Sequence, residues 1–157
     1  MKLITNNDKK NNHEQVITKL IEISEVIVIC SGWMKMGGLK LVLPSLNKAI
    51  KNNADITIYS DGATTKTKTL IDKVKSIKGV KHFITDGGRP VHSKIFYFES
   101  KGGFTSIIGS ANITKGGLSS NDELSVLFNG DVGSHEHNMV VEYLEKLHKN
   151  TRFKLNT

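Results

Sequence analysis

Apolar residues along the chain follow two different spacings, and each spacing predicts a different kind of element. Four segments place apolar residues three and four positions apart, the spacing of one helix face, while six shorter segments are continuously apolar or alternate as strands do. The helical segments are His13–Glu25, Leu39–Ile50, Thr65–Ile77 and Glu136–His148. The strand segments are Val26–Cys30, Asp55–Ser60, Val80–Ile84, Lys94–Glu99, Phe104–Ser110 and Leu124–Phe128.

The order of these segments predicts an α/β fold. Helices and strands alternate in the first half of the chain, whereas the later strands follow one another, and Ser100–Gly103 has the glycines of a hairpin turn. Pro44 interrupts the second helical segment, so we expect a kink or a restart of the helix there. The residues Met1–Asn12 are polar and predict no element. Alternating helices followed by hairpins predict an α/β sandwich with a mixed sheet.

The length and composition fit a single domain that spans residues 1–157. Hydrophobic residues make up 38% of the chain, which is enough for one core without disulfides. The one cysteine, Cys30, ends an apolar run, which is typical of a small buried core residue and not of a reactive thiol. A single cysteine cannot form a disulfide within the chain, and it cannot build a metal cluster with other cysteines.

No segment has the features of a membrane span or a signal peptide. A span needs about 18 consecutive apolar residues, and no run in this sequence approaches that length. The polar amino-terminal stretch also lacks the apolar run of a signal peptide. We therefore expect a cytoplasmic protein that does not enter a membrane.

The net charge of +7 and a pI near 9.5 indicate a polyanionic partner, either nucleic acid or an anionic membrane surface. The alternative is that solvated lysines simply keep the protein in solution. Arg89 and Arg152 are the only arginines. Because bidentate readout of guanine depends on arginine, so few arginines favour binding of the backbone over reading of the sequence.

The candidate chemistry lies between Gly87 and Val126. His92 and Lys94 stand two positions apart where a glycine-rich loop enters a predicted strand, so their side chains project to the same side. The segment Gly109–Asn112 follows the next strand and adds a hydroxyl, an amide and a flexible backbone at a strand end. Strand ends and the loops after them often hold functional groups. Each residue alone is a weak signal, and it is the combination that indicates chemistry.

Together these residues follow the order of the HKD signature of the phospholipase D superfamily. The residues that match it in order are His92, Lys94, Gly109, Ser110, Asn112, Asn121 and Glu123. The chain therefore resembles this superfamily over Arg89–Leu127, and Ser31–Leu39 resembles the start of its small nucleases. It is most similar to the nuclease domain of metal-independent type II restriction endonucleases.

The sequence departs from the signature at its acid. Glu99 stands where the superfamily usually has aspartate, and the nine residues Ser100–Ile108 separate it from Gly109, against six in the pattern. The acid of the signature is a structural partner of the motif. The departure therefore leaves the set of His92, Lys94 and Asn112 intact.

The resemblance implies a phospholipase D-like α/β/α sandwich and a phosphodiesterase that needs no cofactor and no metal. His92 would be the nucleophile and would form a phosphohistidine, because a neutral imidazole is nucleophilic near pH 7. Lys94 and Asn112 would bind the non-bridging oxygens, with Ser110 as a further donor. Glu123 would orient the ring of His92.

The chain has one His-x-Lys motif, whereas members of the superfamily use two, one histidine to attack phosphorus and one to protonate the leaving oxygen. The resemblance therefore implies a homodimer with two-fold symmetry, in which His92 and Lys94 of both subunits form one site at the interface.

Several residues near the motif have two interpretations. Arg89 could contact a substrate phosphate or could be a solvated loop residue, and Lys115 is a further candidate for substrate binding. Trp33 could stack on a base, although a packing role is favoured. The segment His135–His137 suggests a metal site, but two histidines two positions apart do not share a helix face, so this interpretation is disfavoured.

Three functions remain open at this point. The first is hydrolysis of nucleic acid, most simply DNA, which the basic charge and the resemblance to restriction nucleases favour. The second is hydrolysis of phospholipid headgroups, which predicts an apolar interfacial surface, although only 6% of the residues are aromatic. The third is a non-catalytic nucleic-acid-binding module of the same fold, which the intact set of His92, Lys94, Asn112 and Glu123 disfavours.

Overall fold

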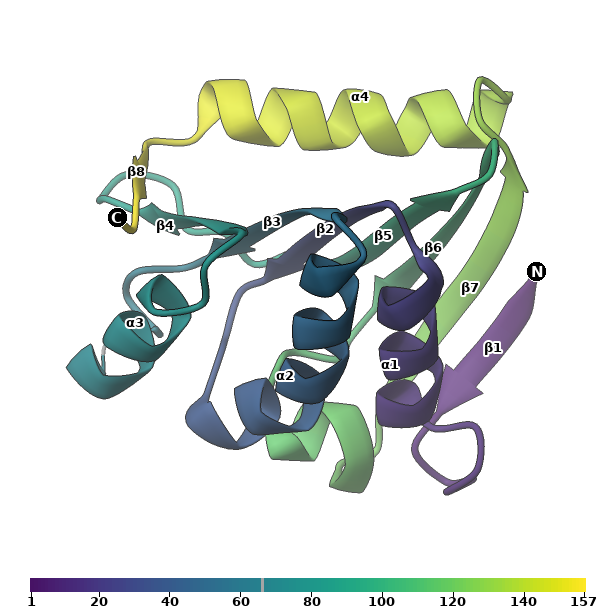
Figure 1. Cartoon of the computed structure of the whole chain (residues 1–157), viewed down its shortest axis with the longest axis horizontal. Coiled ribbons are helices and arrows are strands. Elements are labelled where there is room, and N and C mark those ends of the chain that lie inside the picture. The colour runs from purple at the N-terminus through teal and green to yellow at the C-terminus, as the bar shows by residue number, and fades with distance from the viewer. Residues whose placement is uncertain (66) are drawn as a thin grey trace.

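One mixed β-sheet with helices on both faces organises the chain (Figure 1). The computed structural model describes residues 1–65 and 67–157. The strands are β1 (Lys2–Thr5), β2 (Val26–Ser31), β3 (Asp55–Ser60), β4 (Val80–Thr85), β5 (Lys94–Ser100), β6 (Gly103–Gly109), β7 (Leu124–Asp131) and β8 (Phe153–Leu155). The helices are α1 (His13–Ile23), α2 (Met36–Lys51), α3 (Lys68–Lys75), α4 (His135–Asn150) and a short π-helical turn, η1 (Gly116–Ser120).

The strand order is β1-β7-β6-β5-β2-β3-β4-β8, and it divides the sheet into two halves. Strands β2, β3 and β4 are parallel, because α2 and α3 cross over between them. Strands β5, β6 and β7 are antiparallel and are joined in sequence, and β5 pairs antiparallel with β2. The C-terminal ends of β2, β3 and β4 therefore lie at the same edge of the sheet as the start of β5 and the end of β6.

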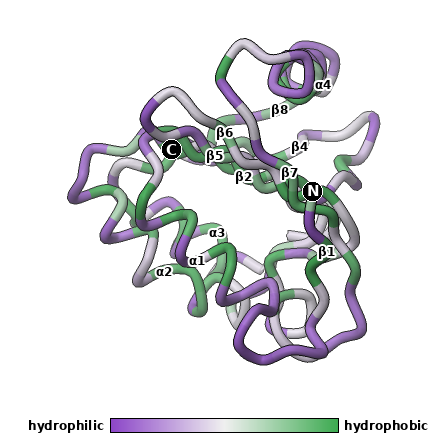
Figure 2. The backbone as a smooth tube through the Cα atoms, turned by 90° about the vertical axis from the view of Figure 1, so that its right-hand side faces the viewer, coloured by the Kyte–Doolittle hydropathy of each residue, from purple (hydrophilic) through white to green (hydrophobic). Residues whose placement is uncertain are grey.

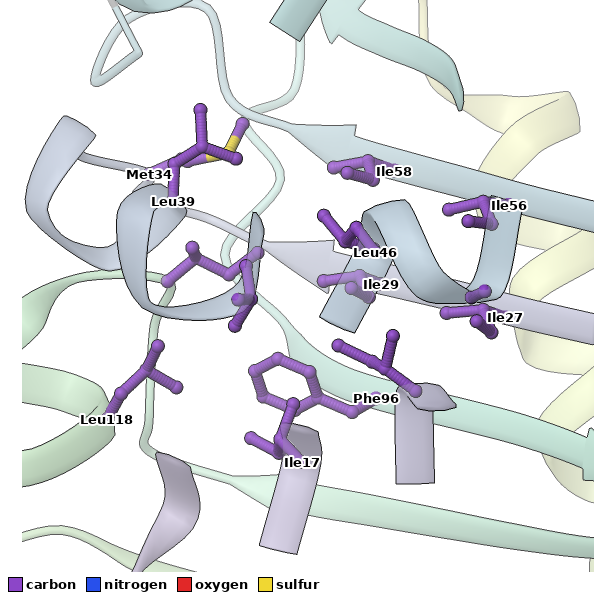
Figure 3. Close-up of a cluster of buried hydrophobic side chains, with 14 of the residues drawn as sticks. Ile17, Ile27, Ile29, Met34, Leu39, Leu46, Ile56, Ile58, Phe96 and Leu118 are labelled. Carbon is purple, nitrogen blue, oxygen red and sulfur yellow. The ribbon is translucent and has the colours of Figure 1, made fainter. Parts of the chain in front are cut away.

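The two faces of the sheet bury separate hydrophobic clusters. Helices α1, α2 and α3 cover one face, and α4 alone covers the other (Figures 1 and 2). Figure 3 shows part of the larger cluster, in which Leu46 of α2 lies beside Ile29 of β2 and Ile58 of β3, and Leu39 of the same helix lies beside Met34. On the opposite face, Tyr97 and Phe104 pack with Val140 and Leu144 of α4. The predicted single-domain α/β/α sandwich with a mixed sheet is confirmed.

The strongly patterned segments form the predicted elements, with two corrections inside helices. Pro44 does not restart the second helix: α2 continues through it, and the carbonyl that loses its partner belongs to the exposed Lys40, where water can replace the bond. The helix predicted over Thr65–Ile77 is shorter in the structure, where α3 begins at Lys68. Lys66, within that prediction, lies outside the described residues.

Three elements were not predicted, namely β1, η1 and β8. Within β1 only Ile4 is buried, so no apolar pattern marks this strand, and it forms because it pairs with the distant β7. Strand β8 has three residues and pairs with β4 at the other edge of the sheet.

Within the described residues, no helix combines the length and the hydrophobicity that crossing a bilayer requires.

Candidate active site

His92 and Lys94 lie where the chain enters β5, in the middle of the sheet. The preceding loop turns at Gly87 and Gly88, whose φ angles of 81° and 74° are positive. Gly32, at the end of β2, packs directly against the backbone of His92: a Cβ atom there would come within 2.8 Å of the Val91 carbonyl oxygen and 3.1 Å of the His92 Cα atom. The sheet therefore fixes the backbone position of His92 through contacts with the end of β2.

The side chains of His92 and Lys94 approach one another as the two-residue spacing predicted. Lys94 Nζ lies 3.2 Å from His92 Nδ1 and 3.5 Å from His92 Nε2, and it also donates a hydrogen bond to the His92 carbonyl. The imidazole is exposed and the lysine is half-buried. Partial burial lowers the pKa of Lys94, although the nearby Glu123 carboxylate favours its charged form. The pair therefore presents an accessible imidazole beside an ammonium group.

Asn112 is oriented by the end of β2. Its Oδ1 accepts a hydrogen bond from the Trp33 backbone N–H at 3.0 Å and lies 3.3 Å from the Ser31 hydroxyl. Because a backbone N–H can only donate, the amide oxygen must face it, and the Nδ2 group is left to donate elsewhere. The Ser31 hydroxyl is fully buried and also accepts a hydrogen bond from the Ile113 N–H at 2.9 Å. The side-chain amide of Asn112 is thus held in one orientation.

Ser110 and Glu123 form a hydrogen-bonded pair next to these groups. The Ser110 hydroxyl donates to the Glu123 carboxylate and accepts from the Leu124 N–H at 3.1 Å. Asn121 Nδ2 donates to the other carboxylate oxygen of Glu123 at 3.4 Å. Within the described part of this single chain, no hydrogen bond joins Glu123 to His92. The orienting role predicted for Glu123 therefore stays a prediction.

One open pocket of about 740 Å³ brings four of the predicted residues together. Its lining contains His92, Lys94, Ser110 and Asn112, together with Ser93, Ile95, Ile108, Gly109 and Tyr143. None of the described residues that line it is an aspartate or a glutamate, and Glu123 lies behind Ser110, so a phosphodiester would meet an ammonium group, an amide N–H and an imidazole. This set can bind an anionic ester and offer it a nucleophile.

Three further predicted residues lie outside this pocket. Arg89 lines a neighbouring cavity that shares His92 with the pocket. Lys115 is exposed just before η1, where its Cβ atom lies against Gly37 of α2. Glu99 lies near the opposite end of β5, where it accepts hydrogen bonds from the Tyr97 hydroxyl and from His137. These contacts give Glu99 structural partners remote from His92.

Two residues differ from their expected placement. Trp33 is not a core residue: its side chain is 44% exposed, and the Lys35 ammonium lies 4.2 Å from the ring centroid. Tyr143 belongs to the apolar positions of the segment Glu136–His148, whose spacing predicts an inward face, yet it is 43% exposed and lines the pocket. In contrast, His137 is buried against Glu99 while His135 is exposed, so these two histidines do not form one site.

Cys30 lies directly beneath the motif and is fully buried, as predicted. Its Sγ atom is 3.2 Å from the Ser93 hydroxyl oxygen. Burial raises the pKa of the thiol to about 11, so it stays protonated at neutral pH. The thiol packs under the site and is not a nucleophile in it.

The geometry agrees with a comparison of the sequence with known families. The family described as "Cardiolipin synthase, PLD-like domain" matches residues 2–148, which is nearly the whole chain. The chain belongs to this phospholipase D-like family. The resemblance inferred from the HKD signature is therefore confirmed at the level of the family. No curated protein matches the sequence.

Solved structures of three other proteins share the fold at low sequence identity. Nuc from Salmonella typhimurium superposes with a TM-score of 0.75 at 15% identity, covering 98% of this chain and 96% of that one. NucT from Helicobacter pylori gives 0.76 at 14% identity, with 96% of each chain covered. Phosphatidylserine synthase from Haemophilus influenzae gives 0.72 at 11% identity, covering 98% of this chain and 39% of that one. At such identities the superpositions show the shared fold.

Proposed function

We propose that this protein is a nuclease, which hydrolyses phosphodiester bonds of nucleic acid, most simply DNA, through a phosphohistidine intermediate. Membership in the phospholipase D-like family and the likeness to Nuc and NucT support a phosphodiesterase. The observation on which the proposal depends is the pocket in which His92, Lys94, Ser110 and Asn112 meet without a carboxylate in the lining.

The chemistry follows from the charge of the substrate. A phosphodiester repels nucleophiles until its non-bridging oxygens are neutralised, and Lys94 Nζ and Asn112 Nδ2 are the donors available for this task. The His92 ring then attacks phosphorus, a P–N bond forms, and the P–O bond to the leaving oxygen breaks. Water hydrolyses the phosphohistidine in a second displacement, which returns the imidazole. Apart from this water, side chains supply every group in the two proposed steps, so the proposed reaction needs no metal ion and no cofactor.

A second copy of the chain would supply the proton for the leaving oxygen, because each chain has one His-x-Lys motif. An apolar patch beside the pocket supports a homodimer. Ile108, Leu124 and Met139 are 38%, 55% and 58% exposed, and Ile108 lines the pocket itself. Burial of this patch between two copies would bring both His92 rings toward one two-fold axis.

Nicking of a supercoiled plasmid in excess EDTA tests the proposed reaction. We expect the wild-type protein to convert the plasmid to the open circle and His92→Ala to lose this activity by a factor of at least about 10³, as expected when a covalent nucleophile is removed. His135→Ala is the matched control, because His135 is exposed at the start of α4 and remote from the pocket. Equal activity of wild type and His92→Ala would contradict the proposal.

Two alternatives predict different results. The family description and the likeness to phosphatidylserine synthase favour a phospholipid substrate, which predicts activity on lipid vesicles and none on plasmid. A non-catalytic nucleic-acid-binding module predicts plasmid binding without cleavage by either protein. The likeness to restriction endonucleases and a cytoplasmic location also remain predictions.

A further inference from the structure

The active-site pocket is continuous with a second cavity that the proposed reaction does not use. This cavity, of about 550 Å³, shares His92, Ser93 and Tyr143 with the pocket. We name it the α4 groove, because it lies between the segment Arg89–Ser93 and the C-terminal half of α4. Its other lining residues are Lys146, Leu147, Asn150 and Thr151.

Charge distinguishes the α4 groove from the cavity on the other side of the same loop. The α4 groove is lined by Arg89 and Lys146 and by no aspartate or glutamate. Lys146 pairs with Glu142, which is outside the lining. A cavity of about 860 Å³ shares Pro90 of this loop with the groove, and its charged lining residues are Asp61, Asp86 and Lys154. A polyanion that passes through the pocket would therefore be attracted into the α4 groove more strongly than into this cavity of mixed charge.

The helix presents a polar and aromatic stripe to the groove. Tyr143, Lys146, Leu147 and Asn150 are spaced at i, i+3, i+4 and i+7, so they lie on one side of α4. Tyr143 is at the junction, since it lines both the pocket and the groove, and it is 43% exposed. A half-exposed ring next to a phosphate-binding pocket offers a face on which a nucleobase can stack.

We infer that the α4 groove binds one strand of nucleic acid next to the scissile phosphate, with Tyr143 stacking on a base and Arg89 binding a neighbouring phosphate. This inference rests on the proposed nuclease function and names its substrate class as single-stranded. In a duplex each base pairs with the opposite strand and stacks on its neighbours. A base that is free to stack on a side chain is therefore available only in a single strand, a flap or a frayed end.

Kinetics on three substrates tests the inference: a short labelled single strand, the same strand in a duplex, and bis(4-nitrophenyl) phosphate, a diester without bases. We expect Tyr143→Ala to raise KM for the single strand by about 5- to 100-fold, from a stacking contribution of about 1–3 kcal/mol, and to change hydrolysis of the small diester much less. Tyr143→Phe retains the ring and should stay within about 3-fold of wild type. Arg89→Ala should raise KM for the single strand and reduce its salt dependence.

Lys149→Ala is the matched control for charge, because Lys149 lies on the same helix outside the groove lining. The inference is overturned if Tyr143→Ala and Arg89→Ala match Lys149→Ala on the single strand, or if the duplex is cleaved with an equal KM. It is also overturned if Tyr143→Ala turns a dimer into a monomer in light scattering, since the ring would then belong to the subunit contact. Hydrolysis of the small diester by a wild type that cleaves no nucleic acid would instead refute the proposed nuclease function.

Discussion

At the scale of single residues, the Ser31 hydroxyl supports the candidate active site although Ser31 is not part of the HKD signature. It is buried between the amide oxygen of Asn112 and the Ile113 N–H. The same hydroxyl also donates to the Trp33 carbonyl at 2.8 Å. We expect Ser31→Ala to lower kcat by about 10-fold with a smaller change in KM, because hydrogen bonds worth about 1–1.5 kcal/mol each are lost and the backbone segments that position Asn112 loosen. Steady-state kinetics on the small diester measures this effect.

A double-mutant cycle separates positioning of Asn112 from a general loss of structure. In an Asn112→Ala background, Ser31→Ala should add little to the loss of activity, because the group that it orients is already absent. Additive losses in kcat would mean that Ser31 acts on the site by another route.

His82 makes folding stability depend on pH. It is buried in β4, where its Nδ1 accepts a hydrogen bond from Asn156 Nδ2 at 3.2 Å and its Nε2 lies 2.8 Å from the Ser60 hydroxyl oxygen. Burial lowers the pKa of His82 from 6.5 to about 4. Between these values the unfolded chain takes up a proton that the folded chain does not, so stability is retained above pH 6.5 and falls as the pH drops toward 4.

Urea unfolding at a series of pH values measures this loss. From the pKa shift, the contribution of His82 amounts to at most about 3 kcal/mol at the acidic end. His82→Gln has no titrating ring, and its stability should fall less steeply over the same range. Parallel curves for the two proteins would show that other groups, such as the buried His13, whose pKa is also lowered by burial, dominate the acid response.

At the scale of elements, the first turn of α2 rests on the segment that positions Asn112. A Cβ atom on Gly38 would lie 2.3 Å from the Ile113 carbonyl group, whereas one on Gly37 would meet only the Lys115 Cβ atom at 3.5 Å, an ordinary contact. The Lys35 N–H also donates to the Ile113 carbonyl at 2.9 Å. The start of the helix and the segment that contains Asn112 and Ile113 are therefore in backbone contact.

We expect Gly38→Ala to destabilise the protein by about 2 kcal/mol or more through overpacking, and to lower activity further because the segment with Asn112 must shift. Gly37→Ala is the matched control on the same turn, and it should be neutral or stabilising by up to about 1 kcal/mol, as replacing a helical glycine allows. Thermal unfolding and diester hydrolysis of both variants measure the difference. Equal stability and equal activity of the two variants would contradict the close contact between Gly38 and the Ile113 carbonyl group.

The sequence predicts elements well where one segment contains the whole signal. The β-branched run of β2 and the apolar stripe of α1 are such segments, and the two-residue spacing of His92 and Lys94 predicts that they face the same side. Strand β1 was missed because its pairing partner, β7, is more than a hundred residues away. The contact of Ser31 with Asn112 was missed for the same reason, since it depends on how β2 and β6 are placed in the sheet.

At the scale of the whole molecule, the face of the sheet that α4 covers is left partly open beside the pocket. The apolar patch lies there: Ile108 and Met139 line one cavity, and Leu124 begins β7, which pairs with the strand of Ile108. We expect the double variant Ile108→Glu and Met139→Glu to be a monomer with little nuclease activity, because buried carboxylates oppose association of the two copies. Light scattering gives the mass, and plasmid nicking gives the activity.

Ile23→Glu is the control for this experiment, because Ile23 is 67% exposed at the end of α1, on the opposite face of the sheet. It should keep both the dimer and the activity. If the double variant or the wild type were a fully active monomer, one chain would form a complete active site. This result would refute the proposal that two subunits share one site.

The burial of Cys30 makes spectroscopic labelling of this protein simple. Its protonated thiol, enclosed beneath Ser93, will not react with a maleimide under conditions that modify an exposed cysteine. A cysteine introduced in place of Lys101, which is exposed in the β5–β6 turn, would therefore be the single attachment point for a fluorophore or a nitroxide. In the proposed dimer, one probe on each subunit would then report the separation of the two turns by resonance energy transfer while substrate is bound and cleaved.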